Sequence, residues 1–215
     1  MKTFDFSGKN VLIRVDFNVP QDDQLNITDN TRIKAALPTI SAVLQAGGTA
    51  VLMSHLGRPN GERSAKYSLG SLVGELKSLT GATVYFSEDC IGDAAKDVIE
   101  GAGPGEIVLL ENLRFYKEET EGDREFAGAL AELGDIYLND AFGTAHRAHA
   151  STAIIAEYFG DDDKGFGSLM EAEVKSISKA LGSERATTVA IIGGAKVSSK
   201  IGVISNMLKK HQDWQ

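Results

Sequence analysis

The stretch VLIRVDFNVP, residues 11–20, decides the fold class of this chain. Residues 11–15 are apolar apart from Arg14, and polar side chains and Pro20 follow them directly. Similar short apolar runs recur along the chain, and they predict strands at residues 11–15, 49–53, 82–86, 106–110, 135–138 and 188–192. Because these runs are nearly continuous in their apolar character, we expect a parallel sheet that is covered on both faces.

The segments between the expected strands carry apolar residues at helical spacing. The three helix faces would consist of Ile33, Leu37, Ile40 and Leu44, then Leu72, Leu76 and Leu79, and finally Met170, Val174, Ile177 and Leu181. Pro38 lies inside the first pattern, so we expect either a kink or a later helix start. Residues 161–165 are expected to form an exposed loop before a long helix. This alternation of strands and helices predicts a doubly wound, Rossmann-like α/β fold.

The composition argues against several classes of protein. With 42% hydrophobic residues among 215, the chain can fill a core, which excludes a disordered chain. The 22 Lys and Arg against 30 Asp and Glu give a net charge of −8, so we expect neither nucleic acid nor a membrane surface as a partner. No apolar run is long enough for a membrane span or a signal peptide, and the single cysteine, Cys90, fits a reducing compartment. We therefore expect a cytoplasmic location.

Charged side chains gather just after the expected strands. The residues in these positions are Asp16, Asn18, His55, Arg58, Arg114 and Arg147. Ligands of open α/β sheets bind outside the carboxyl ends of the strands, and the guanidinium group matches carboxylate and phosphate oxygens. The pattern therefore predicts a site for a small, multiply charged anion. The alternative interpretation is that each arginine pairs with a surface carboxylate.

Several polar residues near the expected site allow more than one interpretation. Arg32 follows the capping residues TDN, 28–30, so it lies near an expected helix start, where a cation is unfavourable unless an anion lies there too. Asp16 and Asn18 suit a substrate hydroxyl, but they could also form a turn before Pro20. His55 could equally be packed within its loop, and His149 is expected to be a structural or surface residue.

The segment IIGGAKVSSK, residues 191–200, combines a strand end, two glycines and a helix start. Its free backbone amides and the ammonium groups of Lys196 and Lys200 suit a phosphate group. The spacing differs from that of a Walker A motif. The alternative here is an ordinary glycine turn.

Five stretches together resemble the phosphoglycerate kinase family. They are RVDFNVP (14–20), SHLGRP (54–59), LENLRF (110–115), NDAFGTAHRAH (139–149) and GGAKV (193–197), and they occur in the family's order. The resemblance implies a glycolytic transferase that moves a phosphoryl group reversibly between 1,3-bisphosphoglycerate and ADP. The products would be 3-phosphoglycerate and ATP.

The resemblance also assigns roles to individual residues. Substrate would be bound by Asp16, Phe17, Asn18, Arg32, His55, Leu56, Gly57, Arg58, Arg114 and Arg147. Arg32 and Lys196 would be catalytic, since they stabilise the transferring phosphoryl group. The nucleotide would be contacted by Gly194, Ala195, Lys196 and Lys200. Mg would arrive as the MgATP or MgADP complex and be coordinated mainly by a second domain, with no metal ligand expected in this chain.

Family members are about twice as long as this chain, which bears on its domain organisation. The resemblance implies a substrate-binding domain at 1–167, an interdomain helix at 168–187 and the start of a truncated nucleotide-binding domain at 188–215. Such a chain is expected to bind the triose and to contact ADP or ATP only in part, and to be inactive alone. The full-length enzyme is expected to be a monomer. Residues 188–215 are apolar enough to self-associate or to fold back on the first domain.

Two other functions remain possible at the level of sequence. One is a freestanding module that binds a phosphorylated acid and has no kinase activity. The other, which the five stretches disfavour, is an α/β sugar-phosphate enzyme complete in one domain.

Overall fold

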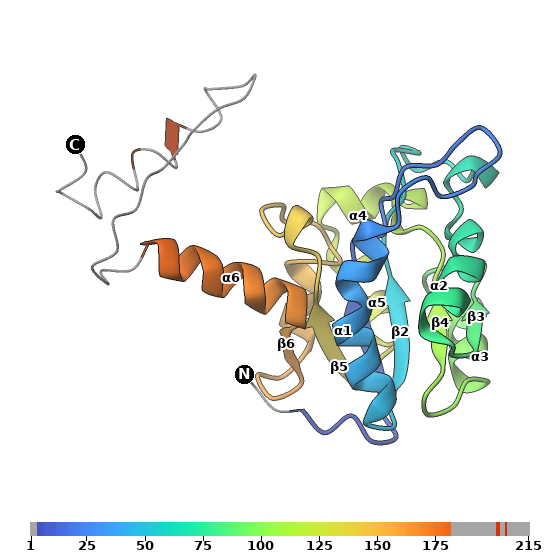
Figure 1. The fold of residues 1–215 in the computed structure, drawn as a ribbon, viewed down its shortest axis with the longest axis horizontal. Coiled ribbons are helices and arrows are strands. Elements are labelled where there is room, and N and C mark those ends of the chain that lie inside the picture. Colours follow the sequence, from blue (N-terminus) through green and yellow to red (C-terminus); the bar gives the residue numbers. More distant parts are fainter. Residues whose placement is uncertain (1–3, 182–200, 203–204, 206–215) are drawn as a thin grey trace. The chain divides into compact units, whose positions relative to one another are not determined.

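A computed structural model describes residues 4–181, 201–202 and 205 (Figure 1). The chain divides into two compact units, Met1–Glu171 and Ala172–Gln215. The first unit holds a six-stranded sheet in the order β3-β4-β2-β1-β5-β6, and all neighbouring strands run parallel. The strands are β1 (Asn10–Arg14), β2 (Thr49–Met53), β3 (Val84–Phe86), β4 (Ile107–Leu109), β5 (Ile136–Asn139) and β6 (Lys164–Phe166). The predicted α/β fold with a parallel sheet is confirmed.

Five of the six expected strands appear in the sheet, and the sixth, at 188–192, lies outside the described residues. Strand β1 lies inside the sheet between β2 and β5, with Val11 opposite both Ala50 and Ile136. Its side chains alternate between two core clusters, since Val11 and Ile13 join one and Leu12 joins the other. Both faces of β1 are therefore buried, which explains its apolar run.

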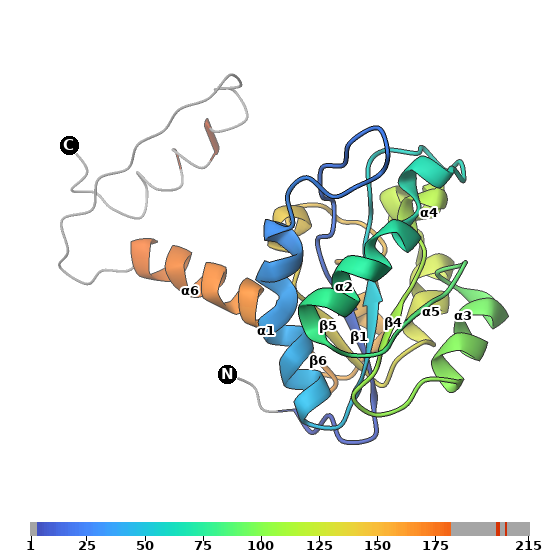
Figure 2. The ribbon, with the colours of Figure 1, turned by 45° about the vertical axis from the view of Figure 1, so that its right-hand side comes forward.

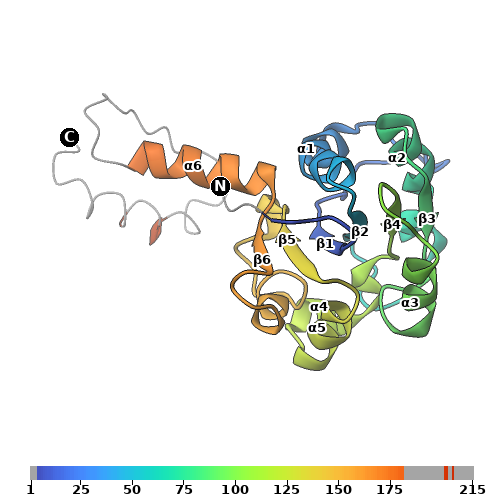
Figure 3. The same cartoon turned by 90° about the horizontal axis from the view of Figure 1, so that it is seen from below.

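Helices cover both faces of this sheet. Helices α1 (Thr31–Gln45) and α2 (Val73–Thr80) lie side by side on one face, as Figures 2 and 3 show, and α3 (Gly92–Glu100), α4 (Lys117–Glu121) and α5 (Arg124–Ala131) lie on the other. Short 3-10 helices occupy several connections: η1 (Ala65–Tyr67), η2 (Leu69–Leu72), η3 (Leu113–Phe115), η4 (Phe142–Thr144) and η5 (Ile154–Tyr158). None of the helices in the described part of the chain has both the length and the apolarity that a membrane span requires.

Helix α1 begins at Thr31, before Pro38, so the expectation of a later start is wrong. Pro38 lies on the exposed side of the helix, where water can satisfy the carbonyl that has no proline N–H to bind. The Asp29 carboxylate accepts a hydrogen bond from the Thr31 amide at 2.8 Å. The start of α1 is thus stabilised in front of the proline.

The expectation of a plain loop at 161–165 is also wrong, because Lys164–Phe166 forms strand β6 at the edge of the sheet. It pairs with β5, with Tyr137 opposite Lys164 and Asn139 opposite Phe166. The strand has only three residues, and one of them is glycine, so its sequence carries no apolar run.

The long helix expected near the end of the described chain is α6 (Ser168–Leu181). Its first turn is held by Asp140, whose Oδ1 accepts hydrogen bonds from the amides of Leu169 at 3.0 Å and Met170 at 3.1 Å. Thr39 of α1 donates to Asp140 Oδ2 at 2.6 Å and accepts from the Ser168 amide at 2.8 Å. These contacts satisfy three amides that have no partner within the helix.

Candidate functional site

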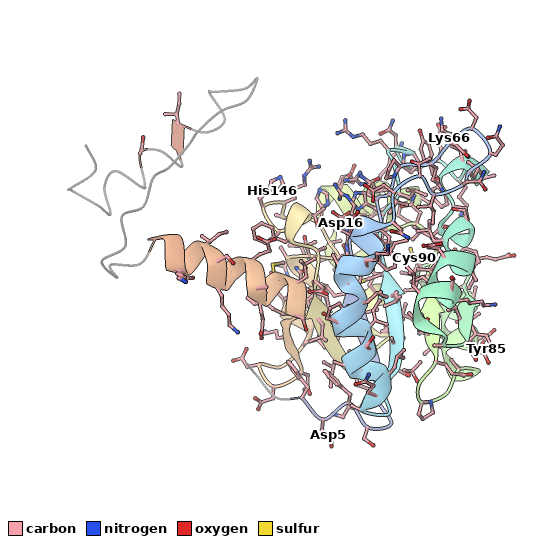
Figure 4. All side chains as sticks on the ribbon, viewed as in Figure 1. Asp5, Asp16, Lys66, Tyr85, Cys90 and His146 are labelled. Carbon is pink, nitrogen blue, oxygen red and sulfur yellow. The ribbon has the colours of Figure 1, made fainter. Side chains whose placement is uncertain are left out.

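The loops that follow the strands meet at one end of the sheet. Figure 4 shows Asp16 and His146 at the end to which the β2 arrow points, whereas Asp5 lies at the opposite end. This is the carboxyl edge of a parallel sheet, where ligands of such folds bind. The sequence prediction of a shared edge therefore holds for Asp16 and for the loop after β5.

A cavity of about 550 Å³ opens at this edge. Its lining consists of Arg58, Asn60, Gly61, Arg114, Tyr116, Lys117, Thr120 and Arg147. Four of these eight described residues are cationic and none is acidic, in a protein with a net charge of −8. We call this space the cation cavity, and its composition favours a compact, multiply charged anion.

The three arginines of the cation cavity are not paired with acids. Among the ion pairs within the described part of the chain, none involves Arg58, Arg114 or Arg147. The alternative that each arginine pairs with a surface carboxylate is therefore wrong for these three. It is correct for Arg32, which pairs with Asp16.

Arg114 is the most enclosed of these arginines. Its Nη1 donates to the carbonyl of Gly57 at 2.8 Å, which holds the guanidinium group in place. Burial and the positive charges of Arg14 and Arg147 lower the pKa of Arg114 from its ordinary value. Because an arginine remains charged all the same, this mutual repulsion would be relieved by a bound anion.

The loop after β2 is shaped by Asn112, which is fully buried. Its amide group donates to the carbonyls of Leu56 at 2.7 Å and Tyr67 at 2.8 Å, and its Oδ1 accepts from the amides of Leu56 at 3.3 Å and Arg114 at 3.0 Å. Gly57 is next in this loop, with a φ of 63°, and a side chain there would strike the Tyr67 ring. The sequence SHLGRP thus needs glycine at its fourth position.

The residues after β1 lie beside the loop that follows β2 and form another wall of the candidate site. Asn18 Oδ1 accepts from the Gly57 amide at 2.9 Å, and the Asp16 carboxylate pairs with Arg32 of α1. Arg32 lies in the first turn of α1 as expected, with its side chain 51% exposed. Asp16, Asn18 and Arg32 are therefore gathered at the same edge, although none of them lines the cation cavity itself.

Two of the expected binding residues have buried side chains, so only their backbones could face a ligand. The side chains of Phe17 and Leu56 are buried in the core, at 0% and 3% exposure. The Phe17 amide donates to Ser54 Oγ at 2.9 Å, and this bond ties the loop after β1 to the loop after β2. A second cavity of about 430 Å³ lies along this junction and is lined in part by Asn18, Gly57, Lys66 and Tyr67.

His55 is 4% exposed and lies against Arg14, the last residue of β1. Its Nδ1 is 3.3 Å from Arg14 Nη2, and because a guanidinium group can only donate, Nδ1 must be the acceptor. Burial, with the positive charges of Arg14 and Arg114, lowers the pKa of His55 to about 2. His55 is therefore a neutral imidazole with its proton on Nε2, and it can donate one hydrogen bond to a ligand.

Sequence reasoning missed several residues of this site. Lys117 and Thr120 line the cation cavity from α4, and Lys117 follows Arg114 by three residues, a spacing that could have indicated it. The predicted nucleotide-contacting residues Gly194, Ala195, Lys196 and Lys200 lie outside the described residues. Most of 188–215 also lies outside them, so the self-association expected of this segment stays a prediction. Within the residues that are described, no cluster of three or more His, Cys, Asp or Glu is arranged to hold a metal ion.

Comparison with known proteins places these features in a family. The family model described as phosphoglycerate kinase matches residues 1–214. Curated relatives include the phosphoglycerate kinase of Desulfotalea psychrophila, 47% identical over 98% of this chain and 53% of the relative. The phosphoglycerate kinase of Borrelia hermsii is 51% identical over 98% of this chain and 53% of the relative. The cytosolic phosphoglycerate kinase of Nicotiana tabacum is 49% identical over 98% of this chain and 52% of the relative.

Solved structures agree with these sequence matches. The structure of phosphoglycerate kinase from Coxiella burnetii has a TM-score of 0.83 at 37% identity, covering 97% of this chain and 51% of its own. That from Pyrococcus horikoshii also has a TM-score of 0.83, at 33% identity. The chain spans about half the length of the relatives that it matches. On sequence and on fold alike, this chain belongs to the phosphoglycerate kinase family.

Proposed function

We propose that this chain is the substrate-binding part of a phosphoglycerate kinase, which transfers a phosphoryl group between 1,3-bisphosphoglycerate and ADP. The observation that carries the proposal is the cation cavity, where Arg58, Arg114, Arg147 and Lys117 converge without an acid. A phosphate group that stays on the substrate would bind there. Family membership supplies the reaction, a step of glycolysis with 3-phosphoglycerate and ATP as products.

The remaining substrate contacts follow from the walls of the site. Asp16 and Asn18 offer acceptors to a substrate hydroxyl, and His55 offers its Nε2 proton to a carboxylate oxygen. The backbones of Phe17, Leu56 and Gly57 complete this wall, because their side chains are buried or absent. A three-carbon acid with a phosphate at one end would span from this wall to the cation cavity.

Arg32 is the proposed catalytic residue within the described chain. Phosphoryl transfer needs in-line positioning and neutralisation of charge on the equatorial oxygens, and it needs no protein nucleophile. The exposed guanidinium group of Arg32 pairs with Asp16, and no second ion pair within the described residues restrains it. It can therefore turn towards a transferring phosphoryl group. Lys196 would approach the same group, and Gly194, Ala195 and Lys200 would contact the nucleotide phosphates.

The domain organisation belongs to the same proposal. Residues 1–167 would form the substrate-binding domain, 168–187 the interdomain helix, and 188–215 the opening of the nucleotide-binding domain. MgATP or MgADP would be a substrate held mainly by the rest of that domain. The 215 residues alone are therefore expected to bind the triose with negligible turnover, and the full-length enzyme to act as a cytoplasmic monomer.

Calorimetry with 3-phosphoglycerate tests this proposal on the chain as it stands. Arg58→Ala or Arg114→Ala removes a charge-assisted contact, and Kd should rise about tenfold to about 150-fold, equivalent to about 1.5 to 3 kcal/mol. Arg124→Ala is the matched control, because Arg124 pairs with Glu157 and lines no part of the cavity. Equal binding by the wild type and both cavity variants would refute the site.

The alternative of a freestanding binding module has its own outcome. If the chain binds 3-phosphoglycerate but gains no kinase activity when the other half of a family member is supplied, the module is favoured. Recovery of even a little turnover supports the kinase.

A further inference from the structure

A cluster of buried charged and polar side chains is built from the same segments as the cation cavity. Its members are Arg14, His55, Glu119, His149 and Ser151, and none of them is more than 7% exposed. Arg14 ends β1, His55 follows β2, Glu119 lies in α4, and Ser151 follows the loop that carries Arg147. The cluster therefore joins four segments that shape the site.

Glu119 is the acidic centre of this cluster and is fully buried. Its Oε1 accepts from Ser151 Oγ at 2.7 Å, and its Oε2 accepts from the Ser151 amide at 3.0 Å. The backbone carbonyl of Glu119 also accepts from the Ala150 amide at 2.9 Å. These bonds fasten α4, with its cavity residues Lys117 and Thr120, to the segment that follows Arg147.

Arg14 is connected to Glu119 in two ways. Its Nη2 is 3.9 Å from Glu119 Oε1, and its Nε donates to Ser151 Oγ at 2.8 Å. The Ser151 hydroxyl thus accepts from Arg14 and donates to Glu119, which links the two charges through one oxygen. The same guanidinium group reaches His55 Nδ1 at 3.3 Å and the carbonyl of Val15 at 2.5 Å.

The buried carboxylate of Glu119 is unexpected so close to a proposed anion site. A buried negative charge near an anion site repels the anion, so Glu119 cannot favour anion binding by its charge. A buried guanidinium group without a carboxylate is costly, and Arg14 would move if its partner were lost. The orientation of Arg14 in turn determines which nitrogen of His55 carries the proton.

We propose that Glu119 is a positioning residue for the substrate site. Through Ser151 and Arg14 it holds His55 as a neutral donor at Nε2. As part of α4 it holds Lys117, and through its bonds to Ala150 and Ser151 it holds the segment after Arg147, so that both cations stay on the walls of the cation cavity. Glu119 touches no ligand itself. This inference rests on the proposed function, because it assigns His55 and the cavity to the binding of a phosphorylated acid.

Calorimetry with 3-phosphoglycerate on the full chain separates positioning from simple electrostatics by the sign of the effect. The variant Glu119→Gln keeps the shape and loses the charge. Positioning predicts that Kd rises about tenfold, the size found for residues that orient ligand-binding groups in metal sites. Electrostatics alone predicts a lower Kd. The control Glu118→Gln removes an exposed carboxylate of the same helix and should stay within about twofold of the wild type.

A second readout follows the ring of His55 directly. In the ¹⁵N NMR spectrum of histidine-labelled chain, with His55 assigned from the His55→Gln variant, the wild type should show the tautomer protonated at Nε2. Glu119→Gln should shift His55 towards a mixture of tautomers, a change that loss of stability alone would not produce. Ser151→Ala keeps both charges but breaks the link, and it should shift His55 in the same direction.

These outcomes keep the two proposals apart. Unchanged or tighter binding by Glu119→Gln, or a His55 signal that neither variant moves, overturns the positioning role. If Glu119→Gln does not fold, Ser151→Ala decides on the same two readouts. If the wild type does not bind 3-phosphoglycerate, the proposed function fails, and the His55 tautomer still decides whether Glu119 positions the ring.

Discussion

Replacing Gly57 by alanine tests how the loop after β2 is built. Two costs can be read from the structure. The φ of 63° lies in the left-handed region, where a side chain costs about 1 to 2 kcal/mol. The new methyl group would also strike the Tyr67 ring, and relieving such an overlap costs about 1 to 3 kcal/mol. We expect Gly57→Ala to lower the free energy of unfolding by about 2 to 5 kcal/mol, which a typical domain can survive.

The chain offers controls that separate the two costs. Gly81 has a φ of 68°, and a Cβ added there would meet no atom within 4 Å, so Gly81→Ala measures the backbone cost alone. Gly74 lies in α2 with no neighbour within 4 Å and no positive φ, so Gly74→Ala should stabilise by about 0.5 to 1 kcal/mol. In a chain that already carries Tyr67→Ala, the overlap is gone, so adding Gly57→Ala should lower stability by the backbone cost alone, measured against Tyr67→Ala.

Urea unfolding measures the loss of stability in Gly57→Ala, and calorimetry measures its binding of 3-phosphoglycerate. Gly57 donates to Asn18 and accepts from Arg114, so movement of its loop should weaken 3-phosphoglycerate binding as well as stability. A Gly57→Ala variant no less stable than Gly81→Ala would show that the Tyr67 ring moves aside freely. That result, together with unchanged binding, would refute the account of this loop.

Two further predictions concern buried groups. Burial raises the pKa of Asp140 above 3.8, so the folded chain binds the carboxyl proton more tightly than the unfolded chain does. Protonated Asp140 therefore stabilises the fold at low pH, and this stabilisation is lost as the pH rises through the raised pKa. Asp140→Asn should therefore gain stability relative to the wild type between about pH 4 and about pH 7, measured by thermal unfolding, and a constant difference would contradict this linkage. Burial raises the pKa of the Cys90 thiol well above its ordinary value, so a thiol reagent at about pH 8 should label the unfolded chain and leave the native chain almost unlabelled.

The central strands and the charged edge could be predicted from sequence because each has a strong local signal. Val11, Leu12 and Ile13 are buried on both faces of one strand, so their apolar run is continuous. The arginines after the strands could be predicted to lie together because parallel strands share one carboxyl edge. Strand β6 was missed since its three residues, Lys164 to Phe166, pair with β5 through backbone bonds that leave no trace in the side-chain pattern.

The buried polar groups could not be predicted from sequence. Arg14 looks like an interruption of an apolar strand, and only the fold brings Ser151 and Glu119 to it from 137 positions and 105 positions away (151 − 14 and 119 − 14). Asn112 similarly donates to the carbonyls of Leu56 and Tyr67, which are 56 and 45 positions away in the sequence. Contacts over such separations follow from the order of the strands, which the local pattern does not specify.

The distribution of ion pairs gives the strongest physical reason to regard the edge of the sheet as a binding site. Elsewhere in the described chain Arg63 pairs with Asp89, Lys96 with Glu132 and Arg124 with Glu157, although exposed pairs of this kind contribute little to stability. Every other arginine of the described chain, namely Arg14, Arg32, Arg63 and Arg124, has a carboxylate partner. Arg58, Arg114 and Arg147 share one cavity, and none of them has a carboxylate partner among the described residues. Glu119, the acid whose charge acts on Arg114, is buried and engaged with Arg14 and Ser151. An arrangement that costs stability in the empty protein is understandable if an anion completes it.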